Sequence, residues 1–163
     1  MSIVAITGAG GYIGQQLIDY LENAPWCERI IGSDIEAPVV QSLKLYFEKQ
    51  DIRSPKLAAF WRDHHVDTVV HLAFVLNPIH DEQKMFDINV NGTLNALQVS
   101  AALNIQNIII ASSGTAYGAW PDNPPALRES DPIRLFPPTF RYAHPKGIIE
   151  EHCAAYLTRH PNT

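Results

Sequence analysis

Thr7-Gly8-Ala9-Gly10-Gly11-Tyr12-Ile13-Gly14 is the stretch of sequence that decides the fold. The short apolar segment 3–6 before it predicts a buried strand. The segment 12–21 after it predicts a helix with Ile13, Leu17 and Leu21 on one face. The glycines therefore occupy a turn from strand to helix.

Three of these glycines, Gly8, Gly11 and Gly14, are spaced three residues apart. In a strand-to-helix turn, this spacing is typical of dinucleotide binding. The first glycine allows a tight turn, the second lets a pyrophosphate approach the N–H groups at the helix N-terminus, and the third lets helix and strand pack closely. The alternative is a tight turn that binds nothing.

An acidic residue follows at the end of the next predicted strand. The predicted strand 29–33 contains Ile30 and Ile31, and Asp34 comes twenty residues after Gly14. A carboxylate at this point can accept hydrogen bonds from an adenosine ribose and would repel a 2′-phosphate. The sequence therefore predicts NAD rather than NADP as the cofactor.

Composition excludes several other classes of function. The chain has 163 residues, enough for about one domain, and its net charge is −5 without a basic run, which argues against nucleic-acid or membrane-surface binding. Cys27 and Cys153 lie far apart in the sequence and show neither the pattern of a disulfide framework nor metal-ligand spacing, and His64, His65 and His80 lack ligand partners at metal-site spacing. We expect no metal, and buried thiols in a reducing compartment.

The N-terminus and the hydropathy pattern predict a cytoplasmic protein. The first residues already form the predicted strand, so we expect no signal peptide. No apolar stretch approaches the length that crosses a membrane.

Strand and helix signals alternate along the rest of the chain. We expect little or no helix between Asp34 and the third strand, and Ser54 is the expected N-cap of the next helix, with Pro55 at its first position. Uninterrupted apolar strands alternating with helices predict an α/β fold, a doubly wound parallel sheet of the Rossmann type with strand order 3-2-1-4-5. The remaining strands are expected over 43–50 (with Leu45 and Phe47 on one face), 66–73 and 107–112, and the remaining helices over 55–61, 81–103 and 140–159.

Segment 114–138 is a long polar stretch with six prolines. It begins where the fifth strand ends, at the edge of the sheet where ligands bind in open α/β folds. A loop of this length in one domain is either functional or disordered, and the position favours function.

Three side chains near that edge suit proton chemistry. Ser113 closes the fifth strand, and Tyr142 and Lys146 are four apart on the last helix, on one face. A phenol has a pKa near 10, and a nearby ammonium favours the phenolate, which makes tyrosine a usable acid or base. Any tyrosine and lysine can fall four apart by chance, but the position after the fifth strand favours catalysis.

Seven motifs in order resemble the extended short-chain dehydrogenase/reductase family, the group of NAD-dependent epimerases and dehydratases. The match covers nearly the whole chain and corresponds to the N-terminal portion of such enzymes. The motifs are the glycine turn 7–14, Asp34, Asp51-Ile52-Arg53, His71-Leu72-Ala73, Asn89-Val90-Asn91-Gly92-Thr93, Ser112-Ser113 with Tyr117-Gly118, and Tyr142-x-x-x-Lys146.

The resemblance implies a role for each matching residue. Ser113, Tyr142 and Lys146 would be the catalytic triad, with Lys146 also holding the nicotinamide ribose, and Thr115 and Tyr117 would face the substrate. The cofactor-binding residues would be Gly8, Gly11, Tyr12, Ile13, Gly14, Asp34, Asp51 and Ile52 (at the adenine), Leu72, Ala73, Asn89 and Lys146.

Plainer interpretations stay open for some of these residues. Asn89 would brace the central helix or satisfy a backbone group, and Tyr117 would otherwise be core packing. His71, at a strand end, is expected to be structural.

Three departures from the family pattern stand out. Phe74 replaces a residue that is often small and would reshape the nicotinamide side. Pro145 lies between Tyr142 and Lys146, so either the helix starts late, with Tyr142 in its first turn, or it kinks. The chain is also short for the family, so we expect residues 1–163 to be one NAD-binding Rossmann domain, a fragment that lacks the C-terminal substrate-binding part.

The expected function is that of an NAD-dependent sugar-nucleotide epimerase or dehydratase in which Tyr142 is the acid/base. The alternatives are an NAD-dependent alcohol dehydrogenase or ketone reductase of the same superfamily, or a non-catalytic NAD-binding module. The substrate would be a small molecule, and the resemblance implies a nucleotide sugar. Apolar residues on the predicted helices 81–103 and 140–159 also predict a homodimer through these two helices.

Overall fold

A computed structural model describes residues 1–76, 80–135, 137 and 142–163 of the protein. Its sheet has five parallel strands in the order β3-β2-β1-β4-β5. This is the predicted order of a doubly wound fold. The strands are β1 (Ser2–Thr7), β2 (Cys27–Asp34), β3 (Leu45–Lys49), β4 (Thr68–His71) and β5 (Asn107–Ile110).

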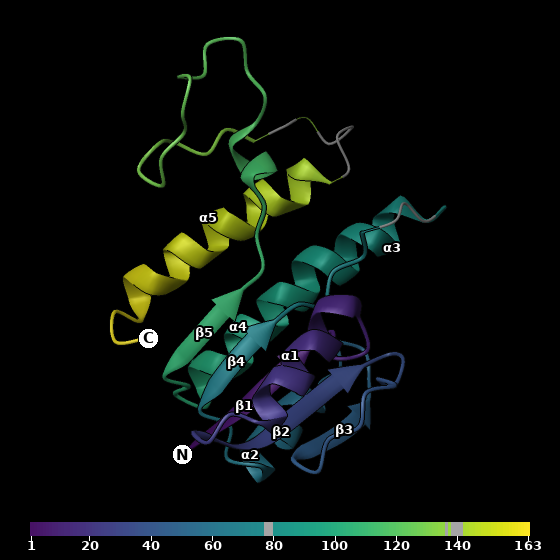
Figure 1. Ribbon diagram of the computed structural model, residues 1–163. Coiled ribbons are helices and arrows are strands. Elements are labelled where there is room, and N and C mark those ends of the chain that lie inside the picture. The colour runs from purple at the N-terminus through teal and green to yellow at the C-terminus, as the bar shows by residue number, and fades with distance from the viewer. Residues whose placement is uncertain (77–79, 136, 138–141) are drawn as a thin grey trace.

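Helices cover both faces of this sheet (Figure 1). On one face α1 packs Ile18 and Leu21 against the sheet. On the other face α2 and α4 contribute Trp61 and Val99 to a second apolar core. The helical elements are α1 (Tyr12–Glu22), α2 (Leu57–Asp63), α3 (Glu82–Phe86), the π-helix η1 (Asp87–Asn91), α4 (Gly92–Ala102), the 3-10 helix η2 (Gly114–Tyr117) and α5 (Ala143–Arg159).

The third strand lies where it was predicted, and Leu45 and Phe47 both pack on the α1 side of the sheet. No helix forms in residues 35–44, which the structure describes in full. All five strands begin or end within a few residues of their predicted bounds.

Two local predictions were wrong. Of the residues predicted on one face of α1, Ile13 is 62% exposed, whereas Leu17 packs against the core and Leu21 is buried. The other buried residues of α1 are Gly14 and Ile18. Ser54 does not cap α2, which begins at Leu57; its hydroxyl accepts a hydrogen bond from the Lys56 N–H in a turn that precedes the helix. Hydrophobic spacing alone does not determine which residues of α1 meet the sheet, and a serine hydroxyl can serve a turn as well as a helix cap.

The helix predicted over 81–103 forms as α3, η1 and α4 in direct succession. Asp81 caps its N-terminus, where its side chain accepts a hydrogen bond from the Lys84 N–H. The π-helical turn inside it is a feature that often marks functional sites.

The last helix begins at Ala143, and Tyr142 is the residue just before it. Pro145 is therefore in the first turn, where its missing N–H removes no hydrogen bond within the helix. Of the two predicted alternatives, the late start is the one observed, but Tyr142 precedes the first turn of the helix and does not lie in it as predicted. The predicted start at Phe140 lies outside the described residues, as do residues 136 and 138 of the predicted loop.

Within the described ranges, no helix is both long and apolar enough to cross a membrane. In the same residues, no group of three or more His, Cys, Asp or Glu side chains could hold a metal ion. Cys27 is buried and Cys153 is partly buried, and both are free thiols.

Candidate functional site

The glycine turn packs directly against the segment that follows β4. Gly8 has a positive φ of 75°, and a Cβ there would lie 2.7 Å from the Ala73 nitrogen. A Cβ on Gly14 would lie 2.2 Å from the Gly8 oxygen, so α1 starts in contact with the turn. Side chains at these two positions would separate backbone segments that now touch, which explains why the sequence has glycine there.

The N-terminus of α1 is open to an anion. Gly11 is its N-cap and makes no side-chain cap, and no acidic residue occupies the first turn. The first N–H groups of a helix have no acceptor within the helix and carry a partial positive charge. A phosphate group at this end would find unpaired donors.

The predicted cofactor-binding residues gather around one cleft of about 360 Å³ at the carboxyl edge of the sheet. It lies between the glycine turn, the ends of β2 and β3, and the segment after β4. The predicted residues that line it are Gly8, Gly11, Asp34, Asp51, Ile52, Leu72 and Ala73, together with Phe74 and Arg53.

Other predicted cofactor-binding residues do not line this cleft. Tyr12 and Ile13 lie at the exposed start of α1, and Gly14 is buried behind the turn. Asn89 and Lys146 are buried beside the cleft, in the contacts described below.

Asp34 is fixed by two backbone donors. Its Oδ2 accepts a hydrogen bond from the Gly10 nitrogen at 2.9 Å, and its Oδ1 accepts one from the Glu36 nitrogen at 3.2 Å. The carboxylate therefore joins the glycine turn to the end of β2. Each of its oxygens retains lone pairs that can accept further bonds from a ligand in the cleft.

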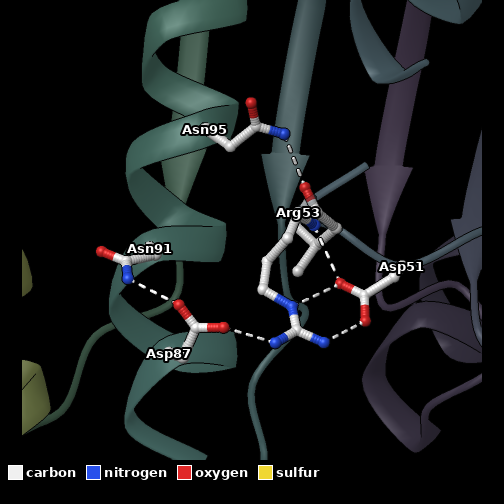
Figure 2. Close-up of polar contacts among 6 residues, drawn as sticks. Asp51, Arg53, Asp87, Asn91 and Asn95 are labelled. Atoms are coloured by element: carbon white, nitrogen blue, oxygen red, sulfur yellow. Dashed lines mark hydrogen bonds and ion pairs between the residues drawn. The ribbon is translucent and has the colours of Figure 1, made fainter. Parts of the chain in front are cut away.

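Asp51 is held by an arginine that also reaches η1. Arg53 donates from Nε to Asp51 Oδ1 at 2.9 Å and pairs with Asp87 on the neighbouring helix, as Figure 2 shows. The hydrogen bonds from Arg53 lower the pKa of Asp51, and the hydrogen bond from Asn91, with that from Arg53, lowers the pKa of Asp87. The network therefore keeps both carboxylates ionised.

A hydrogen bond from α4 holds the backbone of the same segment, residues 51–53. Asn95 of α4 donates from Nδ2 to the Ile52 oxygen at 2.7 Å. Segment 51–53 is thus tied to η1 by Asp87 and to α4 by Asn95 (Figure 2).

Asn89 is fully buried on η1 and holds the segment after β4. Its Oδ1 accepts from the Val75 nitrogen at 2.7 Å, and its Nδ2 donates to the Val75 oxygen at 3.2 Å. The side chain therefore satisfies backbone groups, which is the plainer of its two predicted roles, and in doing so it braces the cleft wall.

His71 is structural, as predicted. Its Nε2 lies 2.9 Å from Thr93 Oγ1, and Thr93 donates its proton to the Asn89 oxygen, so the histidine must donate from Nε2. Its Nδ1 then accepts from Thr7 Oγ1 at 2.7 Å. Burial and the charge of Lys146 lower the pKa of His71 to about 4, which keeps the ring neutral.

Ser113 follows β5 and caps η2. Its Oγ accepts hydrogen bonds from the Thr115 nitrogen at 3.2 Å and from Thr115 Oγ1 at 3.0 Å. These bonds orient the hydroxyl and leave its own proton to be donated. Tyr117 ends η2 and is partly buried, and η2 packs against α5.

Lys146 lies just behind the cleft wall and is only 4% exposed. Its Nζ donates to the Ala111 oxygen at 2.6 Å and lies 3.7 Å from the centre of the Phe74 ring. Burial lowers the pKa of Lys146 to about 8. The Tyr142 ring packs edge-to-face on Phe74, with 5.7 Å between ring centres. Phe74 thus joins the predicted tyrosine–lysine pair to the cleft.

Sequence reasoning missed the roles of Arg53 and Phe74. Arg53 belongs to a recognised triplet, but its partner Asp87 is 34 residues away and nothing in the local sequence pairs them. Phe74 stood out only as a departure from a family pattern, which gave no sign of its contact with Lys146.

A family model described as "NAD dependent epimerase/dehydratase family" matches residues 4–162. A UDP-glucose 4-epimerase of Arabidopsis thaliana is 29% identical over 165 residues, which cover 92% of this chain and 46% of that protein. A putative UDP-glucose 4-epimerase of Methanocaldococcus jannaschii is 30% identical, covering 94% of this chain and 50% of that protein. The chain thus spans about half the length of these curated relatives.

Solved structures share the fold. The UDP-glucose 4-epimerase from Brucella ovis in complex with NAD superimposes with a TM-score of 0.82 at 21% identity, over 99% of this chain and 49% of that one. The UDP-Glc/GlcNAc 4-epimerase from Campylobacter jejuni superimposes with a TM-score of 0.80, also at 21% identity, over 99% of this chain and 51% of that one.

Proposed function

Because the chain belongs to the NAD-dependent epimerase/dehydratase family, we propose that it binds NAD and forms the cofactor-binding part of an enzyme that epimerises or dehydrates a nucleotide sugar. One observation carries the proposal. The cleft formed by the glycine turn, Asp34 and Asp51 shares its wall with the buried Lys146, and Phe74 links that wall to Tyr142.

The residues of the cleft fit NAD. The uncapped N-terminus of α1 would bind the pyrophosphate, and a side chain at Gly8 would collide with the Ala73 backbone and close the approach. Asp34 would accept hydrogen bonds from the adenosine ribose, and Asp51 and Ile52 would bind the adenine. The bound nicotinamide supplies a hydride acceptor that can later return the hydride.

The proton of the substrate hydroxyl would be transferred by Tyr142 with the help of Ser113 and Lys146. The Ser113 hydroxyl, oriented by Thr115, donates a hydrogen bond to the substrate oxygen. The Tyr142 phenolate takes the proton of the substrate hydroxyl and returns it later in the cycle. The positive charge of Lys146 favours this phenolate, and a pKa of about 8 keeps the lysine largely charged at neutral pH.

The substrate class is inferred from relatives. Several are UDP-glucose 4-epimerases, and one solved structure of the same fold contains UDP-glucose and NAD. We propose that Thr115 and Tyr117, together with the rest of segment 114–138, face such a nucleotide sugar.

Cofactor binding is tested by thermal unfolding with NAD+ or NADP+. A ligand at a hundred times its dissociation constant adds about 2.7 kcal/mol to the free energy of unfolding, which is about 5–10 °C in midpoint for a domain of this size. We expect this rise with NAD+ and little with NADP+. In Asp34→Ala the preference for NAD+ should disappear. An unmoved midpoint with either cofactor would contradict the proposal.

Turnover separates the proposed enzyme from its alternatives. With NAD+ and UDP-glucose, an epimerase interconverts sugars without accumulating free NADH, whereas an alcohol dehydrogenase releases NADH with each turnover. Tyr142→Phe should abolish turnover while leaving the NAD+ shift in place. If the enzyme that contains this cofactor-binding part binds NAD+ but shows no turnover, the chain is the non-catalytic module.

The proposed homodimer would use the long helix α3–η1–α4 and α5. Part of the apolar surface predicted for this role is buried within the chain, including Ile149 and Tyr156. Leu157 remains 54% exposed and lines a groove of about 190 Å³ with Ile108 and Cys153. A mass in solution that stays at one chain over all concentrations would contradict the dimer.

A further inference from the structure

The Lys146 ammonium has an aromatic face as one of its close neighbours. Its Nζ lies 3.7 Å from the centre of the Phe74 ring, and its hydrogen bond to the Ala111 oxygen fixes it there. The side chain is 4% exposed, so water contributes little to its solvation. A cation over an aromatic face is attracted by the negative charge of the π system, most strongly where water is excluded.

Phe74 also contacts Tyr142, the second member of the predicted Tyr142–Lys146 pair. Its ring and that of Tyr142 are 5.7 Å apart between centres at an interplanar angle of 80°, an edge-to-face arrangement. Such pairs have a preferred geometry beyond the burial of apolar area. One aromatic ring therefore contacts both Tyr142 and Lys146.

Core packing does not account for this phenylalanine. Neither apolar core formed by the described residues includes Phe74, although its neighbours Leu72 and Ala73 both pack on a core. Phe74 is only partly buried and lines the cleft. Its backbone neighbour Val75 is fixed by Asn89, so the ring is presented from an anchored segment.

We propose that Phe74 is a positioning residue for the Tyr142–Lys146 pair: its ring face holds the Lys146 ammonium charged and in place, and its contact with the Tyr142 ring sets the position of the phenol. The catalytic meaning of this arrangement rests on the proposed function, in which the pair moves the substrate proton. The contact between Phe74 and Lys146 is testable without it.

Other groups that act on the Lys146 charge are few among the described residues. Glu150 and Cys153 on α5 favour the charged form, and burial opposes it. From β4, His71 faces the lysine as a neutral ring. With these groups unchanged, a variation confined to the Phe74 ring isolates the contribution of the aromatic face.

The experiment is a titration of Lys146 by NMR in protein labelled with ¹³C at lysine Cε. The chain has five lysines, and Lys146→Met identifies the signal of interest by its loss. Phe74 is then replaced by pentafluorophenylalanine, which keeps the shape of the ring but removes the negative charge from its face. We expect the Lys146 midpoint to fall by about one pH unit, the size of a water-excluded cation–π contact.

Two controls complete this test. Pentafluorophenylalanine at Phe47, on the α1 side of the sheet, should leave the Lys146 midpoint unchanged. Phe74→Tyr keeps an aromatic face and should leave it close to that of the unaltered protein, whereas Phe74→Leu should lower it. If the fluorinated protein does not fold, the difference in the Lys146 midpoint between Phe74→Tyr and Phe74→Leu tests the proposal by itself. A Lys146 midpoint that is the same with all four side chains at position 74 would overturn the proposal.

The consequence for catalysis has a separate readout. If Lys146 must be charged to favour the Tyr142 phenolate, the alkaline limb of the kcat profile should move to lower pH together with the Lys146 midpoint, with KM little changed. A midpoint that moves while Tyr142→Phe leaves turnover intact would reject the proposed function and retain the Phe74 contact. A midpoint that does not move, in a protein that Tyr142→Phe inactivates, would reject Phe74 and retain the function.

Discussion

Lys146→Met should stabilise the protein at neutral pH. Burial holds the pKa of Lys146 at about 8, against 10.5 for a lysine in water. Below pH 8 the ammonium is charged in both the folded and the unfolded chain, so the folded state carries the whole cost of burying it. The difference of about 2.5 pH units corresponds to about 3 kcal/mol.

Methionine removes this cost and keeps most of the packing. It is unbranched, and its sulfur can contact the Phe74 ring. The hydrogen bond to the Ala111 oxygen is lost, at a net cost of about 1 kcal/mol. The expected net gain is therefore about 2 kcal/mol at pH 7.

This gain should disappear as the pH rises. Between pH 8 and 10.5 the folded protein holds Lys146 neutral while the unfolded chain still binds the proton, so the stability of the unaltered protein rises by about 1.4 kcal/mol per pH unit. Burial also raises the pKa of Cys153 to about 11, but that thiol is present in both proteins and its contribution largely cancels in their difference.

Urea unfolding at pH 7 and pH 10 measures both quantities. The advantage of Lys146→Met should shrink by more than 2 kcal/mol between the two, and the exposed Lys49→Met should change stability little at either pH. The reasoning is refuted if Lys146→Met is clearly less stable at pH 7, or if its difference from the unaltered protein is the same at both pH values.

Two further predictions concern the glycine turn and the buried histidine. Gly14→Ala should lower the free energy of unfolding by about 3 kcal/mol, because its Cβ would lie 2.2 Å from the Gly8 oxygen, while Gly114→Ala, with nothing within 4 Å of its Cβ, should be neutral in the same urea series. Acid should destabilise the protein through His71: its pKa is about 4 when folded and 6.5 when unfolded, so the unfolded chain binds the proton first and about 2–3 kcal/mol is lost as the pH falls from 7 to 4.5. In His71→Gln, the free energy of unfolding should fall by about 2–3 kcal/mol less than in the unaltered protein over the same pH range. Equal losses in the two proteins would show that His71 is not the cause.

The sheet order could be predicted from sequence because its determinants are local. The glycine turn fixes β1 and α1, and the uninterrupted apolar segments identify buried parallel strands. Right-handed crossovers then leave few possible orders. The start of α2 could not be predicted in the same way, because Ser54 offers its hydroxyl equally to a helix cap or to the turn that it forms with Lys56.

The candidate site also contains residues that local motifs predict and contacts that they do not predict. Asp34, Asp51 and Ala73 were found from motifs, because each is at the carboxyl end of a strand and all such ends meet at one edge of the sheet. The partners that hold these residues come from distant segments. Asp87 pairs with Arg53 across 34 residues, and Phe74 meets Lys146 only because α5 packs beside the end of β5.

The π-helical turn η1 explains why a correct helix prediction did not give these contacts. Asp87 on η1 holds the side of the cleft formed by Asp51 through Arg53, and Asn89 on the same turn holds Val75, next to Phe74. A helix predicted as uniform over 81–103 gives no reason for one five-residue turn to serve both ends of the cleft. Because η1 anchors both, a change in this turn should alter the binding of the adenosine half of the cofactor and the setting of the Tyr142–Lys146 pair together.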